Sequence, residues 1–240
     1  GIETGGLSTL AQTTETLMEM YRAASERFAH QGWWPSQAGA DTPEGKLEIS
    51  VGAILTQNTN WRNVERALDN LSAAGAMSVA ALAAIAPAEL AELIRPAGYY
   101  NIKARRLKNF IAVVHRDWGD DMAGFLDRPV SSLREDLLPI NGIGRETADS
   151  IILYAAGKAT FVVDAYTFRV LLRHGLIDVE SDYEMVKELL EGNLPADAAL
   201  FNDFHAQFVA VGKHYCRPRA KCPGCPLEDM PHDPMAGMEY

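Results

Sequence analysis

The stretch from 137 to 173 constrains the fold of this chain more than any other part of the sequence. It reads LLPINGIGRETADSIILYAAGKATFVVDAYTFRVLLR and contains two helix starts separated by a short loop. At the first, Gly142 and Gly144 allow a tight turn and leave backbone N–H groups uncovered at a helix N-terminus. At the second, Asp164 precedes an apolar helix that ends at Gly175, and we expect it to be the N-cap of that helix.

Each helix start has a structural and a functional interpretation. Uncovered amides beside small residues favour an anion such as a phosphate group, but Gly-x-Gly turns are also common in proteins without such a role. Asp164 either only caps its helix or also supplies a carboxylate to a site. Neither feature establishes a function alone.

The rest of the sequence also predicts helices. Asn60 and Ser78 are expected N-caps, Pro87 lies in a first turn, and Ser132-x-x-Glu135 predicts a capping box. The longer predicted helices are Ser8–Phe28, Pro43–Gln57, Trp61–Ala74, Asn101–Asp117, Asp182–Glu191 and Asp197–Tyr215. No sustained period-two alternation occurs, and the β-rich run Phe161–Val163 is too short to build a sheet. The predicted fold class is all-α.

Composition limits the compartment and the partners. The chain has 240 residues, 48% of them hydrophobic, which is enough for one large core or two smaller ones. No apolar run approaches the roughly 20 residues of a membrane span, and no signal peptide precedes the first predicted helix. We therefore expect a cytoplasmic protein that does not engage a membrane.

The net charge of −10 disfavours nucleic acid when taken alone, but the charges are unevenly distributed. Acidic residues concentrate in 117–121, 180–191 and the C-terminal tail. Basic residues gather in 103–108 and 213–221. A basic face on an acidic body is compatible with weak, salt-sensitive binding to DNA.

Several motifs together resemble one family. LP-x-NGIGRETAD followed by VVDAYTFRV is similar to the helix–hairpin–helix and aspartate signature of the endonuclease III superfamily of DNA glycosylases (HhH-GPD). The resemblance continues in GAILTQNTNWRNVERAL, in GYYNIKARRLKNF and in a cysteine cluster, so it covers the chain from about Gly32 onward. It implies a six-helix barrel over 45–158 and a discontinuous helical domain of 1–44 and 159–240, which face each other across a DNA-binding cleft.

The same resemblance implies a partner and a set of contacts. The partner would be double-stranded DNA that contains a damaged base, bound by a monomer of this chain. The residues expected to contact DNA are Asn58, Lys103, Asn141, Gly142, Ile143, Gly144, Arg145, Thr147, Arg217 and Arg219.

The resemblance also assigns a catalytic role to Asp164. Glycosylases of this family extrude a nucleotide and cleave its N-glycosidic bond, and a fixed carboxylate stabilises the positive charge that develops on the sugar. Family members that also nick the abasic site carry a lysine directly after the basic residue of the hairpin. Here Glu146 stands at that position, and a carboxylate cannot form an imine. We therefore expect base removal without strand cleavage.

Gly-Trp-Trp-Pro, LTQNT and GRETAD are most similar to the 3-methyladenine DNA glycosylase III branch. In that branch the tryptophan–proline loop stacks on the flipped base, which corresponds to Trp34 and Pro35, with Trp33 as neighbour. Gln57 and Asn58 match the position that fills the vacated base stack or touches the opposite strand, and Glu146 would lie near the base. An alkylated adenine is cationic, so aromatic stacking can recognise it. The structural alternative is a tryptophan pair that plugs the junction between domains.

Three cysteines form the spacing Cys216-x5-Cys222-x2-Cys225. The family holds a [4Fe-4S] cluster here, with one more residue in the first gap and a fourth cysteine where this chain has Pro231. The adjacent His232 is a candidate fourth ligand. Spacing alone would indicate structural zinc with a Cys3His set, and an empty site is the third possibility.

Two other functions remain open at this stage. The chain could be a glycosylase with lyase activity towards oxidised pyrimidines or mismatched bases, or a DNA-binding module without catalysis. The remaining histidines are weak signals, and His214, beside the first cysteine, is interpreted as a surface histidine.

Overall fold

A computed structural model of the chain describes residues 5–238, and within that range it contains helices and loops and no strand. The predicted all-α fold class is confirmed. None of the described helices is both long enough and apolar enough to cross a membrane.

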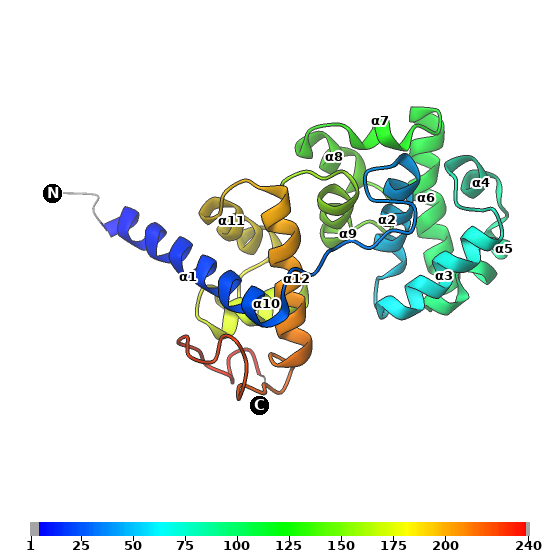
Figure 1. Cartoon of the computed structure of the whole chain (residues 1–240). Coiled ribbons are helices and arrows are strands. Elements are labelled where there is room, and N and C mark those ends of the chain that lie inside the picture. The colour runs from blue at the N-terminus through cyan, green and yellow to red at the C-terminus, as the bar shows by residue number, and fades with distance from the viewer. Residues whose placement is uncertain (1–4, 239–240) are drawn as a thin grey trace. The chain divides into compact units, whose positions relative to one another are not determined.

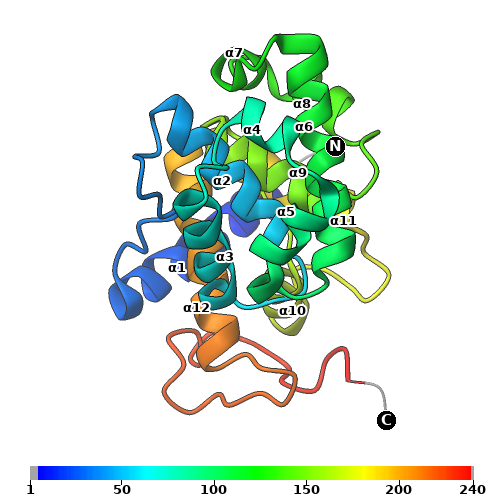
Figure 2. The same cartoon turned by 90° about the vertical axis from the view of Figure 1, so that its right-hand side faces the viewer.

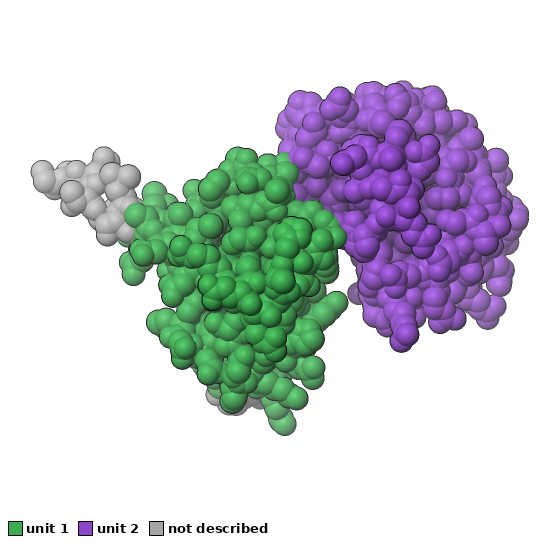
Figure 3. Space-filling model, in the orientation of Figure 1, with its two compact units in different colours: residues 1–33, 159–240 green, residues 34–158 purple. Residues whose placement is uncertain are grey.

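The chain forms two compact units (Figure 3). Unit 1 comprises 1–33 and 159–240, and unit 2 comprises 34–158. The sequence-based division assigned 1–44 to the discontinuous domain, whereas contacts place 34–44 in unit 2. The carboxylate of Glu48 explains the difference, because it accepts hydrogen bonds from Ser36 Oγ at 3.0 Å and Gln37 N at 3.0 Å.

Unit 1 is organised around α12 (Ala198–His214), which packs against α10 (Ala165–Arg173) and α1 (Gly5–Phe28) (Figure 1). Its remaining helix is α11 (Tyr183–Asn193). Most of α12 from Phe201 to Gly212 is buried, and its Phe204 ring stacks on Phe208 at 4.6 Å. Because its apolar side chains supply the core, α12 can serve as a rigid support for side chains on its other face.

The other helices of unit 2 surround α2 (Pro43–Leu55) (Figure 2). The residues of α2 from Ile49 to Leu55 are all buried. The helices around it follow in chain order. They are α3 (Trp61–Ala73), α4 (Val79–Ala84), α5 (Pro87–Leu93), η1 (Arg95–Ala97), α6 (Tyr100–Trp118), α7 (Met122–Leu126), α8 (Val130–Leu137), α9 (Arg145–Ser150) and η2 (Ile151–Ala155).

The predicted caps at Asn60 and Ser78 are confirmed, since each side chain accepts a hydrogen bond from the backbone three residues later. The capping box at Ser132–Glu135 is wrong. Pro129 is the N-cap of α8 and has no side-chain cap, so Ser132 lies inside the helix. The fixed φ of proline starts this helix earlier than the Ser–Glu pair indicates. The short helix α7 was not predicted.

Candidate functional site

The hairpin between α8 and α9 has the backbone that its glycines predicted. Gly142 has a φ of +97°, and Gly144 is the extended N-cap of α9, with no side-chain cap. The turn is closed by the Ile143 amide, which donates to Ile140 O at 3.0 Å. Within the described part of the chain, the amides of Gly142 and Gly144 donate no hydrogen bond to the protein. They remain available to an anion.

A polar cluster supports this hairpin from below. The amide nitrogen of Gln57 donates to Gly142 O at 3.0 Å and to Thr147 Oγ1 at 2.9 Å, and its oxygen accepts from Arg106 Nη1 at 2.6 Å. Two helices, α6 and α9, and the turn therefore meet at the side chain of Gln57, which follows the end of α2. Gln57, predicted to enter the base stack, has its amide engaged within unit 2.

Two residues predicted to contact DNA are buried instead. Thr147 is 8% exposed, because its hydroxyl is the acceptor for Gln57. Lys103 is 1% exposed, and its ammonium donates to Leu55 O and Ala97 O, both at 2.8 Å. Burial, with a smaller effect of the charge on Arg106, lowers the pKa of Lys103 to about 8. Lys103 therefore ties the end of α2 to η1 and Thr147 anchors the hairpin, while their contact with DNA stays a prediction.

Other predicted DNA contacts lie at the surface. Asn58 is exposed and has an unusual left-handed φ of +53°. Asn141, Gly144, Arg145 and Glu146 are exposed at the hairpin. Ile143 is 4% exposed and can contribute only through the turn it stabilises.

Asp164 caps α10, as predicted. Its Oδ1 accepts from the Thr167 amide at 2.7 Å, and its Oδ2 lies 3.1 Å from Nε2 of His205 on α12. The side chain is 11% exposed. Burial opposes its ionisation, but the charge and hydrogen bond of His205 and the Thr167 bonds outweigh burial and hold the pKa of Asp164 below its usual range. The site therefore offers a fixed, ionised carboxylate.

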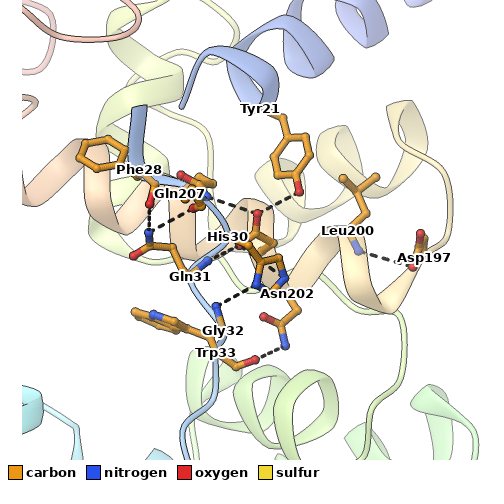
Figure 4. A network of polar contacts seen from close by, with 12 residues as sticks. Tyr21, Phe28, His30, Gln31, Gly32, Trp33, Asp197, Leu200, Asn202 and Gln207 are labelled. Atoms are coloured by element: carbon orange, nitrogen blue, oxygen red, sulfur yellow. Dashed lines mark hydrogen bonds and ion pairs between the residues drawn. The ribbon is translucent and has the colours of Figure 1, made fainter. Parts of the chain in front are cut away.

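Side chains of α12 also hold the loop that leads to the two tryptophans (Figure 4). Asp203 accepts from Tyr21 Oη and from Gln31 N, both at 2.9 Å. Gln207 donates to Ala29 O at 2.7 Å, and Asn202 donates to Trp33 O at 2.6 Å. Burial, followed by the hydrogen bond to Asp203, raises the pKa of Tyr21. The backbone of 29–33 is thus fastened to α12.

The two tryptophans pack in different places. The ring of Trp33 meets His205 edge-on, with centroids 5.7 Å apart. The ring of Trp34 belongs to unit 2, where it meets Trp61 edge-on at 5.1 Å and Tyr154 at 5.2 Å. Pro35 is exposed. Trp34 is therefore part of an aromatic cluster, and Trp61 and Tyr154 are members that the sequence analysis did not single out.

The cysteine loop forms a cavity at the end of α12. Cys216, Cys222, Cys225 and the predicted fourth ligand His232 all line it, together with His174. Buried Arg173 fixes the loop by donating to Arg217 O and Pro218 O, both at 2.6 Å, and it also reaches Cys216 Sγ at 3.3 Å.

Thiol and imidazole groups are suitable in kind for iron–sulfur or zinc ligation, and they line one cavity. Burial raises the pKa of the Cys225 thiol, and the nearby Cys216 and Cys222 add to that effect. Among residues 5–238, however, no three His, Cys, Asp or Glu side chains gather closely enough to hold a metal ion.

Arg217 and Arg219 are exposed on the same loop, where phosphate can reach them.

Comparison with known proteins shows the family of this chain. Residues 51–196 match the model of the HhH-GPD superfamily base excision DNA repair protein. The chain belongs to the HhH-GPD superfamily. It is 42% identical over 217 residues to a Methanocaldococcus jannaschii protein named "Putative DNA repair glycosylase MJ1434", and the match covers 90% of this chain and 95% of that protein.

Two solved structures have a similar fold. The H. pylori 3-methyladenine DNA glycosylase (MagIII) bound to 1,N6-ethenoadenine has a TM-score of 0.68 and 30% identity, covering 84% of this chain and 97% of that one. A non-covalent endonuclease III–DNA complex has a TM-score of 0.71, 20% identity and coverage of 89% and 92%, which shows the fold. This HhH-GPD protein is a base-excision-repair DNA glycosylase, a hydrolase of N-glycosyl bonds that acts on DNA.

His205 was not predicted from the sequence, although a signal for it was present. Asn202, Asp203, His205 and Gln207 interrupt an otherwise apolar helix, and buried polar side chains need partners. Their spacing could have indicated a supporting role for α12.

Proposed function

We propose that this glycosylase removes cationic alkylated purines, with 3-methyladenine preferred, by hydrolysis without lyase activity. The observation that carries the proposal is Asp164, held ionised by two hydrogen bonds at the start of α10. The N-glycosidic bond breaks, its electron pair leaves with the base, and water adds to the sugar carbon. A fixed carboxylate stabilises the positive charge on the sugar during this step.

The preference for a cationic base is supported by the residues around Trp34. A positively charged purine becomes neutral when it departs, so it needs little help from a catalytic acid. Trp34 is half-buried in a cluster with Trp61 and the buried Tyr154, and an aromatic face attracts positive charge. The 30% identity to the H. pylori 3-methyladenine enzyme supports the same substrate class.

The absence of lyase activity is supported by Glu146, which is exposed in the first turn of α9. A carboxylate there cannot attack the sugar to form an imine. Relatives of this chain include proteins named endonuclease III, one of them 26% identical over 184 residues in Thermotoga maritima. A glycosylase with lyase activity is therefore the second candidate.

The test is excision from a panel of duplexes that carry 3-methyladenine, hypoxanthine, uracil, a T·G mismatch or thymine glycol. Released base and strand breaks are measured separately. The proposal expects release of 3-methyladenine fastest, with breaks only after alkali treatment. Preferential release of a neutral pyrimidine would overturn the substrate assignment, and breaks without alkali would overturn the monofunctional assignment.

We also propose that Cys216, Cys222 and Cys225 bind a [4Fe-4S] cluster with His232 as fourth ligand, which would fasten the C-terminal loop. Their shared cavity supports this, and binding would draw the four side chains closer together than they stand in this structure. Freshly purified protein is expected to be brown and to contain iron and sulfide on chemical analysis. Stoichiometric zinc in a colourless protein would contradict it, as would full metal retention by His232→Ala for the fourth ligand.

A further inference from the structure

Helix α12 supports Asp164 and the loop 29–33 at the same time. His205 reaches Asp164. Asn202, one turn earlier, fixes the carbonyl of Trp33 at 2.6 Å (Figure 4). All of these residues belong to unit 1. A single helix therefore sets the position of the carboxylate through the side chain of His205.

The geometry leaves the carboxylate little freedom. Its Oδ1 is held by the Thr167 amide at 2.7 Å and its Oδ2 by His205 Nε2 at 3.1 Å. With one bond the carboxylate could rotate about its last torsion, whereas two bonds on different oxygens fix its plane. Thr167 belongs to α10, the helix that Asp164 caps, so His205 is the partner that links the carboxylate to α12.

The imidazole is itself held in place. His205 is 4% exposed, and the edge-on contact with Trp33, at an interplanar angle of 79°, fixes one side of the ring. Because the Trp33 carbonyl is bonded to α12, the tryptophan and the histidine are supported by the same helix. A ring packed in this way presents Nε2 to Asp164 in one orientation.

We propose that His205 is a positioning residue for base excision: its Nε2–H donates to Asp164 Oδ2 and keeps the carboxylate in the plane that faces the developing charge on the sugar. This inference rests on the proposed function. His205 is buried and acts through the carboxylate that it contacts. The Nε2–H tautomer, or the doubly protonated ring, is required, because a carboxylate only accepts.

The ionisation of Asp164 gives a second readout. Of the titratable groups on the helices near Asp164, His205 of α12 acts on it directly. Two others nearby contact different partners: Tyr183 of α11 accepts from the Val163 amide at 3.3 Å, and Asp203 of α12 accepts from Tyr21. His205 lowers the pKa of Asp164, so its removal raises that pKa. Activity that requires the ionised carboxylate is then lost at a higher pH as the pH falls.

The test uses three substitutions at His205. Gln places an amide N–H near the position of Nε2, Asn carries the same group on a shorter side chain, and Leu removes the donor. Single-turnover excision of 3-methyladenine is expected to fall about 10²-fold in His205→Leu and in His205→Asn, and to stay within about tenfold of the parent in His205→Gln. The acid limb of the pH–rate profile moves to higher pH in His205→Leu.

Equal losses in the Gln and Asn variants would indicate a packing role only and would overturn the proposal, as would parent-like rates in all three. Melting temperature and lesion-duplex binding identify a variant that does not fold, and the Gln–Asn pair still decides if Leu fails. The pKa of Asp164, measured by carbon NMR against Asp164→Asn, is independent of substrate. A parent that excises nothing refutes the proposed function, whereas an unchanged Asp164 pKa in His205→Leu refutes this inference.

Discussion

Replacing Gly142 with alanine should damage unit 2, whereas the same change at Gly144 should not. At a φ of +97° a Cβ on residue 142 would lie 2.1 Å from Cγ of Arg106 and 2.6 Å from its Cδ. The left-handed backbone costs a non-glycine residue about 1–2 kcal/mol. Arg106 must also move and lose its 2.6 Å bond to Gln57, and a bond to a charged group contributes about 1.5–3 kcal/mol.

The sum predicts that Gly142→Ala lowers the free energy of unfolding by about 2.5–5 kcal/mol. Gly144 is the matched control, since its φ is −85° and no atom lies within 4 Å of a Cβ added there. Gly144→Ala should cost at most about 1 kcal/mol, the difference between glycine and alanine at an N-cap. Its methyl group would nevertheless stand beside uncovered amides, so binding to undamaged duplex should weaken.

Urea unfolding and duplex binding of both variants check this reasoning. If Gly142→Ala is as stable as Gly144→Ala, the contact with Arg106 does not support the hairpin. If Gly144→Ala binds duplex as tightly as the parent, the amides at the start of α9 are not a phosphate site.

Three further predictions concern single residues. Borohydride should trap no covalent enzyme–DNA adduct, because Glu146 occupies the position where an imine-forming lysine would be needed; a strong adduct would show that another lysine acts. Trp34→Ala should weaken binding of a 3-methyladenine duplex by about 1–3 kcal/mol and affect a neutral lesion less, and equal losses on both would argue against recognition of charge. Lys103 should make stability rise with pH: its pKa is about 8 when folded against 10.5 when unfolded, so the folded state releases its proton first, and stability increases between those values. Urea titrations at several pH values should show that Lys103→Met removes this rise, and a rise that persists would place its origin elsewhere.

Local signals in the sequence were sufficient for much of the fold. Asn60, Ser78 and Asp164 start helices because each side chain bonds an amide only three residues away. The positive φ of Gly142 and Gly175 follows from the same kind of local requirement. Such interactions depend on neighbours in the chain, so a single sequence contains the information.

Contacts between distant segments could not be predicted in this way. Lys103 occurs in a basic run that suggested a phosphate contact, yet its ammonium satisfies carbonyl groups at the end of α2 and in η1. Thr147 was assigned to DNA for its place in the hairpin, but its hydroxyl accepts from Gln57, 90 residues earlier. His205 and Asp164 are 41 residues apart, and only the packing of α12 on α10 brings them together.

The most direct test of the account is single-turnover excision of 3-methyladenine by the parent and by Asp164→Asn. The amide keeps the size of the side chain and can still cap α10, but it carries no charge. We expect excision to fall by about 10²-fold or more, with binding to the lesion duplex within a few-fold of the parent. Excision within about threefold of the parent would show that Asp164 does not stabilise the transition state and would contradict the account.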